Sequence, residues 1–370
     1  MSGGFYGNVH KLNSDFIVIG AGIIGLTTAH ELRRRGASVT VLEKGEVGRE
    51  ASWAGGGILA TLPPWEYSRS LTQLAHASAR MYPPLVEELI LETGIDPEYE
   101  RSGALVLPSY DEKKAFEWCR ENDVLIQRFP ARDCVPALST QEDALFFSAV
   151  AQIRPPRLLK ALQRRLSNQG VKFLEQSEVR KLNLCGHRVT RITTDEGEFG
   201  AAGIVVCAGA WSRQVLGEFA LDFETKPVKG QMLLFKSKPG LLRPIVLQDE
   251  FYLVPRRDGH ILAGSTIEDA GFDKTISSEA RQTLLGWAHG LLRELNEGNL
   301  VQHWAGLRPG SKTPAIDRHP QIENLYLNSG HFRYGVTMAP GSARLLAGLI
   351  FDEPRLFDAD EFKWPTQSRS

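Results

Sequence analysis

The stretch from Asp15 to Glu43 constrains the fold more than any other part of the sequence. Four apolar residues, Phe16 to Ile19, precede glycines at positions 20, 22 and 25 and then a helix-like run that ends near Arg35. A second apolar run, Val39 to Leu42, is followed by the acidic residue Glu43. Short apolar runs of this kind are typical of strands that are buried on both faces. The order strand, glycine turn, helix, strand and acid predicts an α/β unit with parallel strands.

The glycines and the acid of this unit each have a role in binding a dinucleotide. Gly20 permits the tight turn, Gly22 lets a pyrophosphate approach the backbone, and Gly25 lets the helix pack against the sheet. The helix N-terminus offers free N–H groups and a positive dipole end to phosphates. Glu43, 18 positions after Gly25 (43 minus 25), is placed to accept hydrogen bonds from ribose hydroxyls. A glycine turn of some other α/β unit is the alternative, and the complete order of elements argues against it.

Length and composition limit the class of protein. A chain of 370 residues is long for one core, so two domains are expected. The net charge of −1 gives no overall attraction to nucleic acid or anionic membranes, and no apolar run is as long as a membrane span. The four cysteines lack C-x-x-C spacing, which argues against a zinc site or a disulfide scaffold. Residues 1–14 lack the apolar segment of a secretory signal, so we expect a cytoplasmic protein.

A glycine-rich loop follows the first unit. The loop from Gly45 to Ile58 comes directly after the ribose acid, so it is expected to lie along the cofactor. Its three consecutive glycines let a flat or anionic group approach the backbone. A flexible surface loop is the alternative, but apolar residues flank this one.

Four long helices are predicted in the rest of the chain, and one of them runs from Ser278 to Leu295. The first runs from Leu71 to Thr93, with a break at Pro83-Pro84 because proline lacks the helical N–H donor. The second runs from Pro156 to Gln169, and the last runs from Ala339 to Phe351. The second helix is predicted to have a solvated basic face, formed by Lys160, Arg164 and Arg165.

The residue pattern of the sequence changes after Pro227. Short strand-like runs separated by Gly and Pro then follow one another: Val228–Phe235, Pro244–Leu247, Phe251–Val254 and His260–Ala263. Such runs are typical of antiparallel sheet, so we expect a second domain that binds the substrate. The buried run from Gly203 to Cys207 predicts another strand of the first sheet, whose carboxyl end could face the cofactor.

Together these segments resemble the FAD-dependent D-amino-acid oxidase family, and most of all the glycine oxidases of thiamine biosynthesis. The matching segments span nearly the whole chain: Ile17–Gly25, Gly45–Leu59, Lys226–Phe235, Tyr252–Ser265, Trp304–Gly310 and Gly330–Gly335. The resemblance implies an α/β fold (α+β overall), with a Rossmann-like FAD-binding domain of the D-amino-acid oxidase or glutathione-reductase-2 type. An antiparallel-sheet substrate domain is inserted into it. Residues 1–82, 150–220 and 302–370 are then predicted to bind FAD, and residues 83–149 and 221–301 to bind the substrate.

The resemblance also assigns residues to the cofactor. Two isoleucines lie at the pyrophosphate turn, an acid and a lysine at the ribose, and a valine at the adenine, while the glycine-rich loop and the segment from His331 lie along the flavin. FAD is expected to be held non-covalently, since the last cysteine is Cys207 and related sarcosine oxidases attach flavin further towards the C-terminus. The predicted FAD residues are Gly20, Gly22, Ile23, Ile24, Gly25, Glu43, Lys44, Ala51, Ser52, Gly56, Gly57, Ile58, Val179, His331, Phe332, Arg333, Tyr334, Gly335, Val336 and Thr337.

Three residues are predicted to be catalytic and to bind the substrate. Arg308, in Gly-Leu-Arg-Pro, matches the family arginine that holds the substrate carboxylate, which a guanidinium can bind with two parallel hydrogen bonds. Tyr252 matches a tyrosine that joins this contact, and Arg333 touches substrate or flavin. Taken alone, the first arginine would be a surface ion pair and the tyrosine an ordinary strand residue.

The resemblance implies oxidative deamination of glycine, sarcosine and small D-amino acids by hydride transfer to FAD. Oxygen is then reduced to hydrogen peroxide, and the imine serves thiazole synthesis. No side-chain base and no metal is expected, and neither is a nucleic-acid partner or a membrane span. The partners are a small amine and O2, and the protein is expected to form a homo-oligomer. The open alternative is a D-amino-acid or sarcosine dehydrogenase that passes electrons to another acceptor.

Other function classes fit less well. A tRNA-modifying oxidase would have a basic surface and a fused methyltransferase, and a nicotinamide enzyme would not need the long glycine loop. A purely interacting flavoprotein would not keep Arg308 and Tyr252 in their motifs. The chain departs from the family at Asp317, where a glycine is usual, at Glu250, where glycine oxidases often have histidine, and at Ile267, where they often have methionine. These departures leave the preferred amine open.

Overall fold

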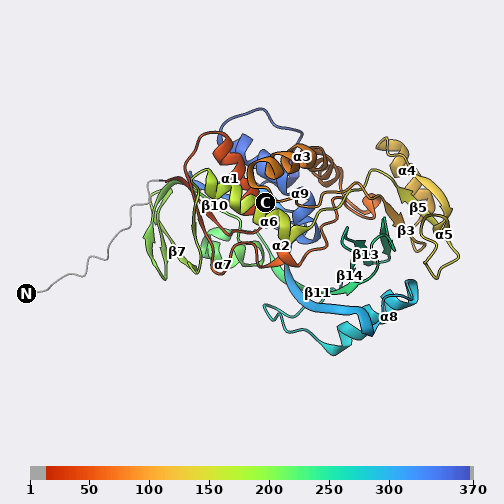
Figure 1. Cartoon of the computed structure of the whole chain (residues 1–370). Helices are drawn as coiled ribbons and strands as arrows, with labels where there is room; N and C mark the ends of the chain where they lie inside the picture. Colours follow the sequence, from red (N-terminus) through yellow and green to blue (C-terminus); the bar gives the residue numbers. More distant parts are fainter. Residues whose placement is uncertain (1–13, 367–370) are drawn as a thin grey trace, which may run out of the picture.

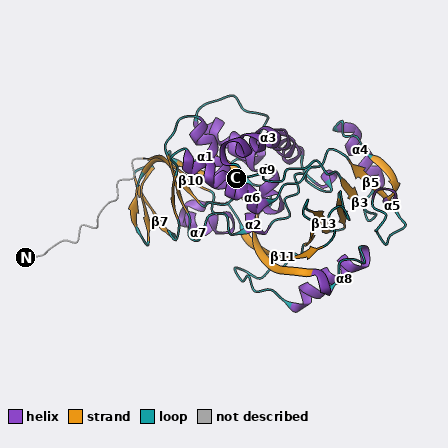
Figure 2. Ribbon diagram, viewed as in Figure 1, coloured by secondary structure: helices purple, strands orange, loops and turns teal. Residues whose placement is uncertain are grey.

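The computed structural model describes residues 14–366 and contains two large sheets and one small sheet (Figure 1). The helices α1, α3, α6 and α9 gather around the first sheet, whereas α8 lies apart against the second (Figure 2). Each large sheet has its own buried clusters of apolar side chains. Residues of both sheets line the cavity described below.

The first sheet has six strands in the order β16-β17-β10-β1-β2-β6. All neighbours are parallel except the edge pair β16–β17. The central strands are apolar and almost wholly buried, as expected of strands covered on both faces. The predicted Rossmann-like unit is therefore confirmed. The strands are β1 (Ser14–Ile19), β2 (Val39–Leu42), β6 (Lys172–Leu174), β10 (Ala201–Val206), β16 (Ala315–Arg318) and β17 (Leu325–Ser329).

Helices on the first sheet bury one apolar face each. Helix α1 (Ile23–Arg34) packs against α9 (Gly335–Ile350), which in turn packs against α3 (Arg69–Thr93), and α6 (Pro155–Asn168) contacts both α1 and α3. Leu26, Leu32 and Leu346 are fully buried among them. Helix α9 begins four residues earlier than the sequence indicated.

Two predictions about these helices were wrong. Helix α3 continues through Pro83 and Pro84 without a break. Tyr82 just before the prolines is fully buried and its hydroxyl donates to the Val336 carbonyl oxygen, so tertiary packing outweighs the missing helical hydrogen bonds. Arg165 does not belong to a solvated face, because its buried guanidinium forms ion pairs with two glutamates of α3, Glu88 at 2.8 Å and Glu92 at 2.9 Å.

The second sheet has eight strands in the order β15-β11-β14-β13-β12-β3-β5-β4. All neighbours are antiparallel except β12 and β3, which are parallel. The predicted antiparallel sheet is thus confirmed with one exception. The strands are β3 (Ala104–Val106), β4 (Gln127–Pro130), β5 (Asp143–Phe147), β11 (Lys226–Lys236), β12 (Ile245–Gln248), β13 (Phe251–Pro255), β14 (His260–Gly264) and β15 (Leu300–Gly310).

The remaining elements belong to the two halves of the molecule, which are the first and the second large sheet with the helices that pack on each. Strands β7 (Val179–Cys185), β8 (Arg188–Thr194) and β9 (Gly197–Phe199) form a three-stranded antiparallel sheet, which includes the predicted hairpin. Helix α8 (Ser278–Leu291) covers the second sheet, and its Leu284 is buried in the apolar cluster of that sheet. The short helices are α2 (Ala51–Ala54), α4 (Glu112–Glu121), α5 (Ala131–Cys134) and α7 (Ser212–Leu216). The predicted domain boundaries stay a proposal, and β15 crosses the one at residue 302.

Candidate active site

A cavity of about 550 Å³ lies where the carboxyl ends of the parallel strands meet the second sheet. Ile19, Leu42 and Ser329, at the ends of β1, β2 and β17, line one side of it. Gly230 of β11 and Gly306 of β15 line the other. Ligands in open α/β sheets bind at this edge, so the cavity is where the sequence places the cofactor.

The glycine turn after β1 is packed too closely to admit side chains. A Cβ on Gly20, which has φ +102°, would lie 2.5 Å from the Cys207 carbonyl oxygen. A Cβ on Gly25 would lie 1.9 Å from the Gly20 carbonyl oxygen, so Gly25 serves helix packing and does not line the cavity. Ser52 Oγ accepts a hydrogen bond of 2.9 Å from the Ile23 N–H and thereby holds α2 against the start of α1.

The Glu43 carboxylate is buried at the end of β2 and held by two backbone donors. Its Oε2 accepts from the Ala21 N–H at 2.8 Å and its Oε1 accepts from the Gly45 N–H at 3.0 Å. These bonds fix the carboxylate at the rim of the glycine turn. Each oxygen keeps a lone pair that can accept a hydroxyl.

A lysine and a tryptophan close the cavity near this acid. The Lys44 ammonium lies 3.0 Å from the centre of the Trp211 ring. Trp211 is the last residue of the 3-10 helix η2 (Gly209–Trp211). Burial lowers the pKa of Lys44, while the nearby Glu50 raises it. The Trp211 ring also packs against Phe272, with ring centres 5.2 Å apart, so a loop of the second half reaches this wall.

A buried arginine fixes the glycine-rich loop from behind. Arg256 donates to the Gly56 carbonyl oxygen at 2.7 Å, to the Ile153 carbonyl oxygen at 3.1 Å and to Gln152 Oε1 at 3.0 Å. Burial lowers the pKa of Arg256 to about 10, so it stays cationic at neutral pH. The backbone of the loop is therefore anchored to the turn after β13.

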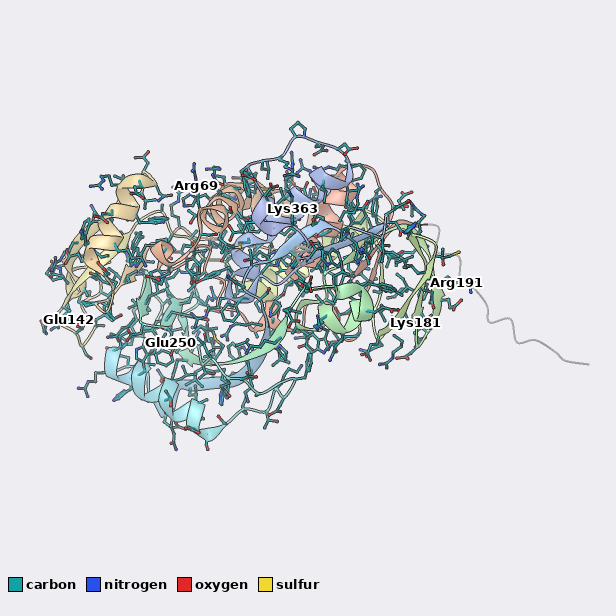
Figure 3. The ribbon with its side chains drawn as sticks, turned by 180° about the vertical axis from the view of Figure 1, so that it is seen from behind. Arg69, Glu142, Lys181, Arg191, Glu250 and Lys363 are labelled. Carbon is teal, nitrogen blue, oxygen red and sulfur yellow. The ribbon has the colours of Figure 1, made fainter. Side chains whose placement is uncertain are left out.

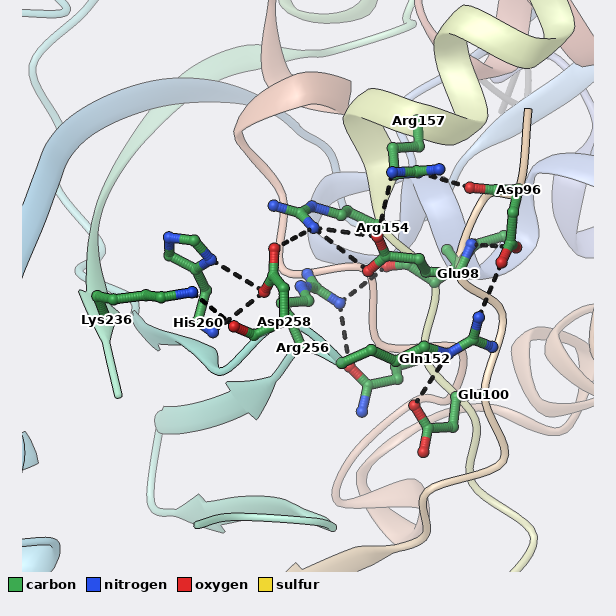
Figure 4. A network of polar contacts seen from close by, with 12 residues as sticks. Asp96, Glu98, Glu100, Gln152, Arg154, Arg157, Lys236, Arg256, Asp258 and His260 are labelled. Atoms are coloured by element: carbon green, nitrogen blue, oxygen red, sulfur yellow. Dashed lines mark hydrogen bonds and ion pairs between the residues drawn. The ribbon is translucent and has the colours of Figure 1, made fainter. Parts of the chain in front are cut away.

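Figure 4 shows that this arginine belongs to a larger polar network between the two halves. Arg154, just before α6, pairs with Glu98 at 3.1 Å and with Asp258 at 2.9 Å. Burial alone would raise the pKa of Asp258, but hydrogen bonds from His260 and Arg154 hold it well below its usual range. The network lies behind the glycine loop, outside the residues that line the cavity.

The second sheet presents a guanidinium to the cavity. Arg308 lies opposite Val228 in the β11–β15 pair, and its Nη1 donates to the Thr266 carbonyl oxygen at 3.1 Å. A Cβ on Gly230 would lie 2.1 Å from Arg308 Nη2, so the planar group lies directly on the Gly230 backbone. Burial lowers the pKa of Arg308, whereas Tyr252 beside it raises it. Tyr252 also packs against Gly56, where an added Cβ would lie 2.9 Å from the ring.

The segment before α9 carries buried polar atoms that have no hydrogen-bond partner in residues 14–366. They include Nε and Nη2 of Arg333, in the 3-10 helix η5 (Phe332–Tyr334), and Nδ1 of His331. The other ring nitrogen of His331 lies 2.9 Å from Ser342 Oγ, and burial lowers the pKa of this histidine to about 3, so the ring is neutral. Tyr334 forms a hydroxyl–hydroxyl hydrogen bond with Tyr67.

Comparison with known proteins places this arrangement in a family. The family model described as FAD dependent oxidoreductase (DAO) matches residues 15–349. This chain belongs to that family of FAD-dependent oxidoreductases. The enzyme class, the FAD cofactor and the fold class expected from the sequence are therefore confirmed.

Similar proteins include glycine oxidases. One from Pseudomonas aeruginosa is 44% identical over 349 residues, which cover 92% of this chain and 96% of that protein. The crystal structure of glycine oxidase from Geobacillus kaustophilus has a TM-score of 0.90 at 27% identity and covers 96% of this chain and 99% of its own. A bifunctional ThiO/ThiG protein of Synechocystis sp. is 31% identical over 93% of this chain and 52% of that protein.

The residues that line the cavity of this FAD-dependent oxidoreductase have the chemical groups that FAD binding requires. The buried polar atoms Arg333 Nη2 and His331 Nδ1 lack a hydrogen-bond partner within residues 14–366, and a bound group would satisfy them, since burying them unpaired is costly. The helix N-terminus, the fixed Glu43 and the Gly22 backbone form a cradle for a pyrophosphate and a ribose.

All the predicted site residues of this oxidoreductase line the cavity except Gly25. Of the three departures from the family, Glu250 lines the cavity, whereas Asp317 and Ile267 do not. Sequence reasoning missed Trp211 and Met232, which also line it. The run Cys207-Ala-Gly-Ala-Trp after a buried strand was the signal for the first, and the second lies in the matching segment Lys226–Phe235.

No helix of the chain between residues 14 and 366 is long and apolar enough to cross a membrane.

Proposed function

We propose that this FAD-dependent oxidoreductase oxidises glycine and similar small amines, such as sarcosine and small D-amino acids, to their imines. The main support for this proposal is the position of the Arg308 guanidinium, which lies on the Gly230 backbone at the cavity wall with Tyr252 beside it. A guanidinium has five N–H donors, and Thr266 takes one of them. The others can bind a carboxylate with two parallel hydrogen bonds.

The proposed roles follow from the positions of the side chains. Arg308 binds the substrate carboxylate, and the Tyr252 hydroxyl donates to the same group. Together they fix the α-carbon over the part of the cavity bordered by Gly56 to Ile58, which orients the reacting bond. Bound FAD would accept two electrons from the amine and pass them to O2, which gives hydrogen peroxide. No side-chain base has to touch the α-hydrogen.

The cofactor contacts are proposed in the same way. The start of α1, with Ile23 and Ile24, would hold the pyrophosphate, and Glu43 and Lys44 would hold the ribose. Val179 at the start of β7 would face the adenine. The loop from Ala51 to Ile58 and the segment from His331 to Thr337 would enclose the flavin.

The product is proposed to serve thiamine biosynthesis, where the imine supplies thiazole synthesis. This proposal is supported by similarity to part of the ThiO/ThiG protein and to the glycine oxidases. The cytoplasmic location and the homo-oligomeric state stay predictions from the sequence. The alternative, a dehydrogenase with another acceptor, is separated by measuring O2 consumption and peroxide formation.

Anaerobic reduction tests the proposal. Purified holoenzyme should lose its visible flavin absorbance when glycine or sarcosine is added without oxygen, and should regain it in air with stoichiometric peroxide. D-Alanine serves as a third substrate that ranks the small D-amino acids. If none of the three bleaches the flavin, the proposed substrate class is wrong. If bleaching occurs but air does not restore the colour, the dehydrogenase alternative replaces the oxidase.

A further inference from the structure

Two acidic and two basic side chains line the same cavity. Arg308 and Arg333 line it together with Asp249 and Glu250, which form the turn between β12 and β13. Glu250 is the last residue of this turn, immediately before β13, which carries Tyr252. The glutamate is therefore presented on the hairpin that also carries the proposed carboxylate-binding tyrosine.

The two guanidiniums differ in their surroundings. Arg308 is partly buried and donates to the Thr266 carbonyl oxygen. Arg333 Nη2 is buried and has no hydrogen bond within residues 14–366, and its anionic neighbour is Glu250 Oε2 at 3.8 Å. The Glu250 side chain is 52% exposed, so it faces both the solvent and the site. Figure 3 labels it in the half that holds α8, away from Lys181 and Arg191.

We infer that Glu250 determines substrate selectivity by occupying the place that a second substrate carboxylate would need beside Arg333. An amine with one carboxylate binds through Arg308 and meets no repulsion. An amine with two carboxylates has to bring its second anion next to Glu250. This inference rests on the proposed function, because it takes Arg308 as the residue that binds the first carboxylate.

The role of Glu250 is rejection of a ligand rather than support of the fold. A half-exposed ion pair at 3.8 Å contributes little to stability. Placing two like charges together at a binding site, in contrast, is a common way to exclude the wrong ligand. Neutralising Glu250 should therefore leave folding and FAD binding unchanged and should free Arg333 for a second anion.

Binding of two inert ether acids tests this without turnover. Methoxyacetate and diglycolate have the shapes of sarcosine and of its dicarboxylic counterpart iminodiacetate, and neither carries an oxidisable amine. Their dissociation constants are measured from the change they cause in the flavin spectrum of the oxidised holoenzyme. Glu250→Gln should bind diglycolate at least about tenfold more tightly than the wild type does, while methoxyacetate should change by less than about threefold.

Two variants control for charge. Glu196→Gln removes one negative charge from the exposed turn between β8 and β9 and should change neither constant. Asp249→Asn removes a charge from the same turn as Glu250, and asparagine tolerates the φ of +54° at that position. Its effect on diglycolate should be clearly smaller, since no ion pair joins Asp249 to Arg333 within the described residues.

Several results would overturn the inference. One is an unchanged affinity of Glu250→Gln for diglycolate, and another is an equal gain in affinity for both ether acids. A third is an equal gain for diglycolate in Asp249→Asn, which would assign the effect to the overall electrostatic potential of the site rather than to Glu250. A turnover experiment complements the binding: kcat/KM for iminodiacetate relative to sarcosine should rise at least about tenfold in Glu250→Gln. If wild type oxidises no amine, the proposed function fails, whereas the ether acids still decide the role of Glu250.

Discussion

Replacing Arg308 with alanine removes the guanidinium that the proposed function assigns to the substrate carboxylate. The side chain donates to the Thr266 carbonyl oxygen, lies beside Tyr252 and lines the cavity, so its loss should leave FAD bound and the fold intact. Arg308→Ala should therefore stay yellow, with a normal flavin spectrum. Turnover of glycine should fall, because both binding and alignment of the α-carbon are lost.

The size of the loss follows from the geometry. Truncating one partner of a buried, hydrogen-bonded charge pair costs roughly 2–5 kcal/mol, which corresponds to a fall in kcat/KM of about 30-fold to several thousand-fold. Arg308→Lys should recover little, because a point charge cannot reproduce two parallel hydrogen bonds. Gly230→Ala should have a similar effect although the arginine itself is kept. The added Cβ would lie 2.1 Å from Arg308 Nη2 and would displace the guanidinium.

The assay compares kcat/KM for glycine with that for a simple amine that has no carboxylate. Because the amine never uses the guanidinium, it should lose much less in Arg308→Ala. Arg191→Ala, on β8 in the small sheet, removes a surface arginine and should change neither value. If both substrates fall by the same factor while the flavin stays bound, Arg308 supports the structure of the site and the carboxylate assignment is wrong.

Three further predictions concern the cofactor. Glu43→Ala should raise the FAD dissociation constant at least about tenfold in fluorescence titration, because a charged hydrogen bond contributes roughly 1.5–3 kcal/mol; an unchanged constant would show that the ribose lies elsewhere. Arg256→Met should weaken FAD binding and shift the flavin spectrum, because the Gly56 carbonyl oxygen loses its donor, and Arg256→Lys should restore part of both; a normal spectrum in Arg256→Met would exclude this positioning role. Trichloroacetic acid should release the flavin into the supernatant, since burial raises the pKa of the cavity-lining Cys207 to about 12 and leaves its thiol unreactive; a yellow pellet would contradict non-covalent binding.

The parts of the site that depend on local sequence could be predicted. The glycine turn and the acid after β2 follow from one continuous stretch, because the spacing of the glycines fixes the turn and the second strand places Glu43 beside it. The place of Arg308 in the cavity came from the resemblance, since no local pattern shows that β15 lies next to β11 at Gly230.

The parts that depend on contacts between distant segments could not be predicted. The packing of Trp211 under Lys44 joins residues 167 positions apart (211 minus 44), and the contact of Glu250 with Arg333 joins a hairpin turn to the start of α9. The helix through Pro83 and Pro84 persists because of burial against other elements, and Arg165 is buried because α3 passes over α6. Tertiary packing overrode local propensity at each of these positions.

The parallel pair of β3 and β12 has a consequence for the order of folding. Of the second sheet, the strands β3, β4 and β5 leave the ribosome first, and β12 follows β3 by 141 residues (245 minus 104). Until then one edge of β3 keeps open backbone donors and acceptors, which can pair with a strand of another chain. Contacts so distant in sequence also form slowly. The interval before β12 is synthesised is therefore when the nascent chain is most exposed to aggregation, and the first sheet, whose β17 begins at Leu325, is completed later still.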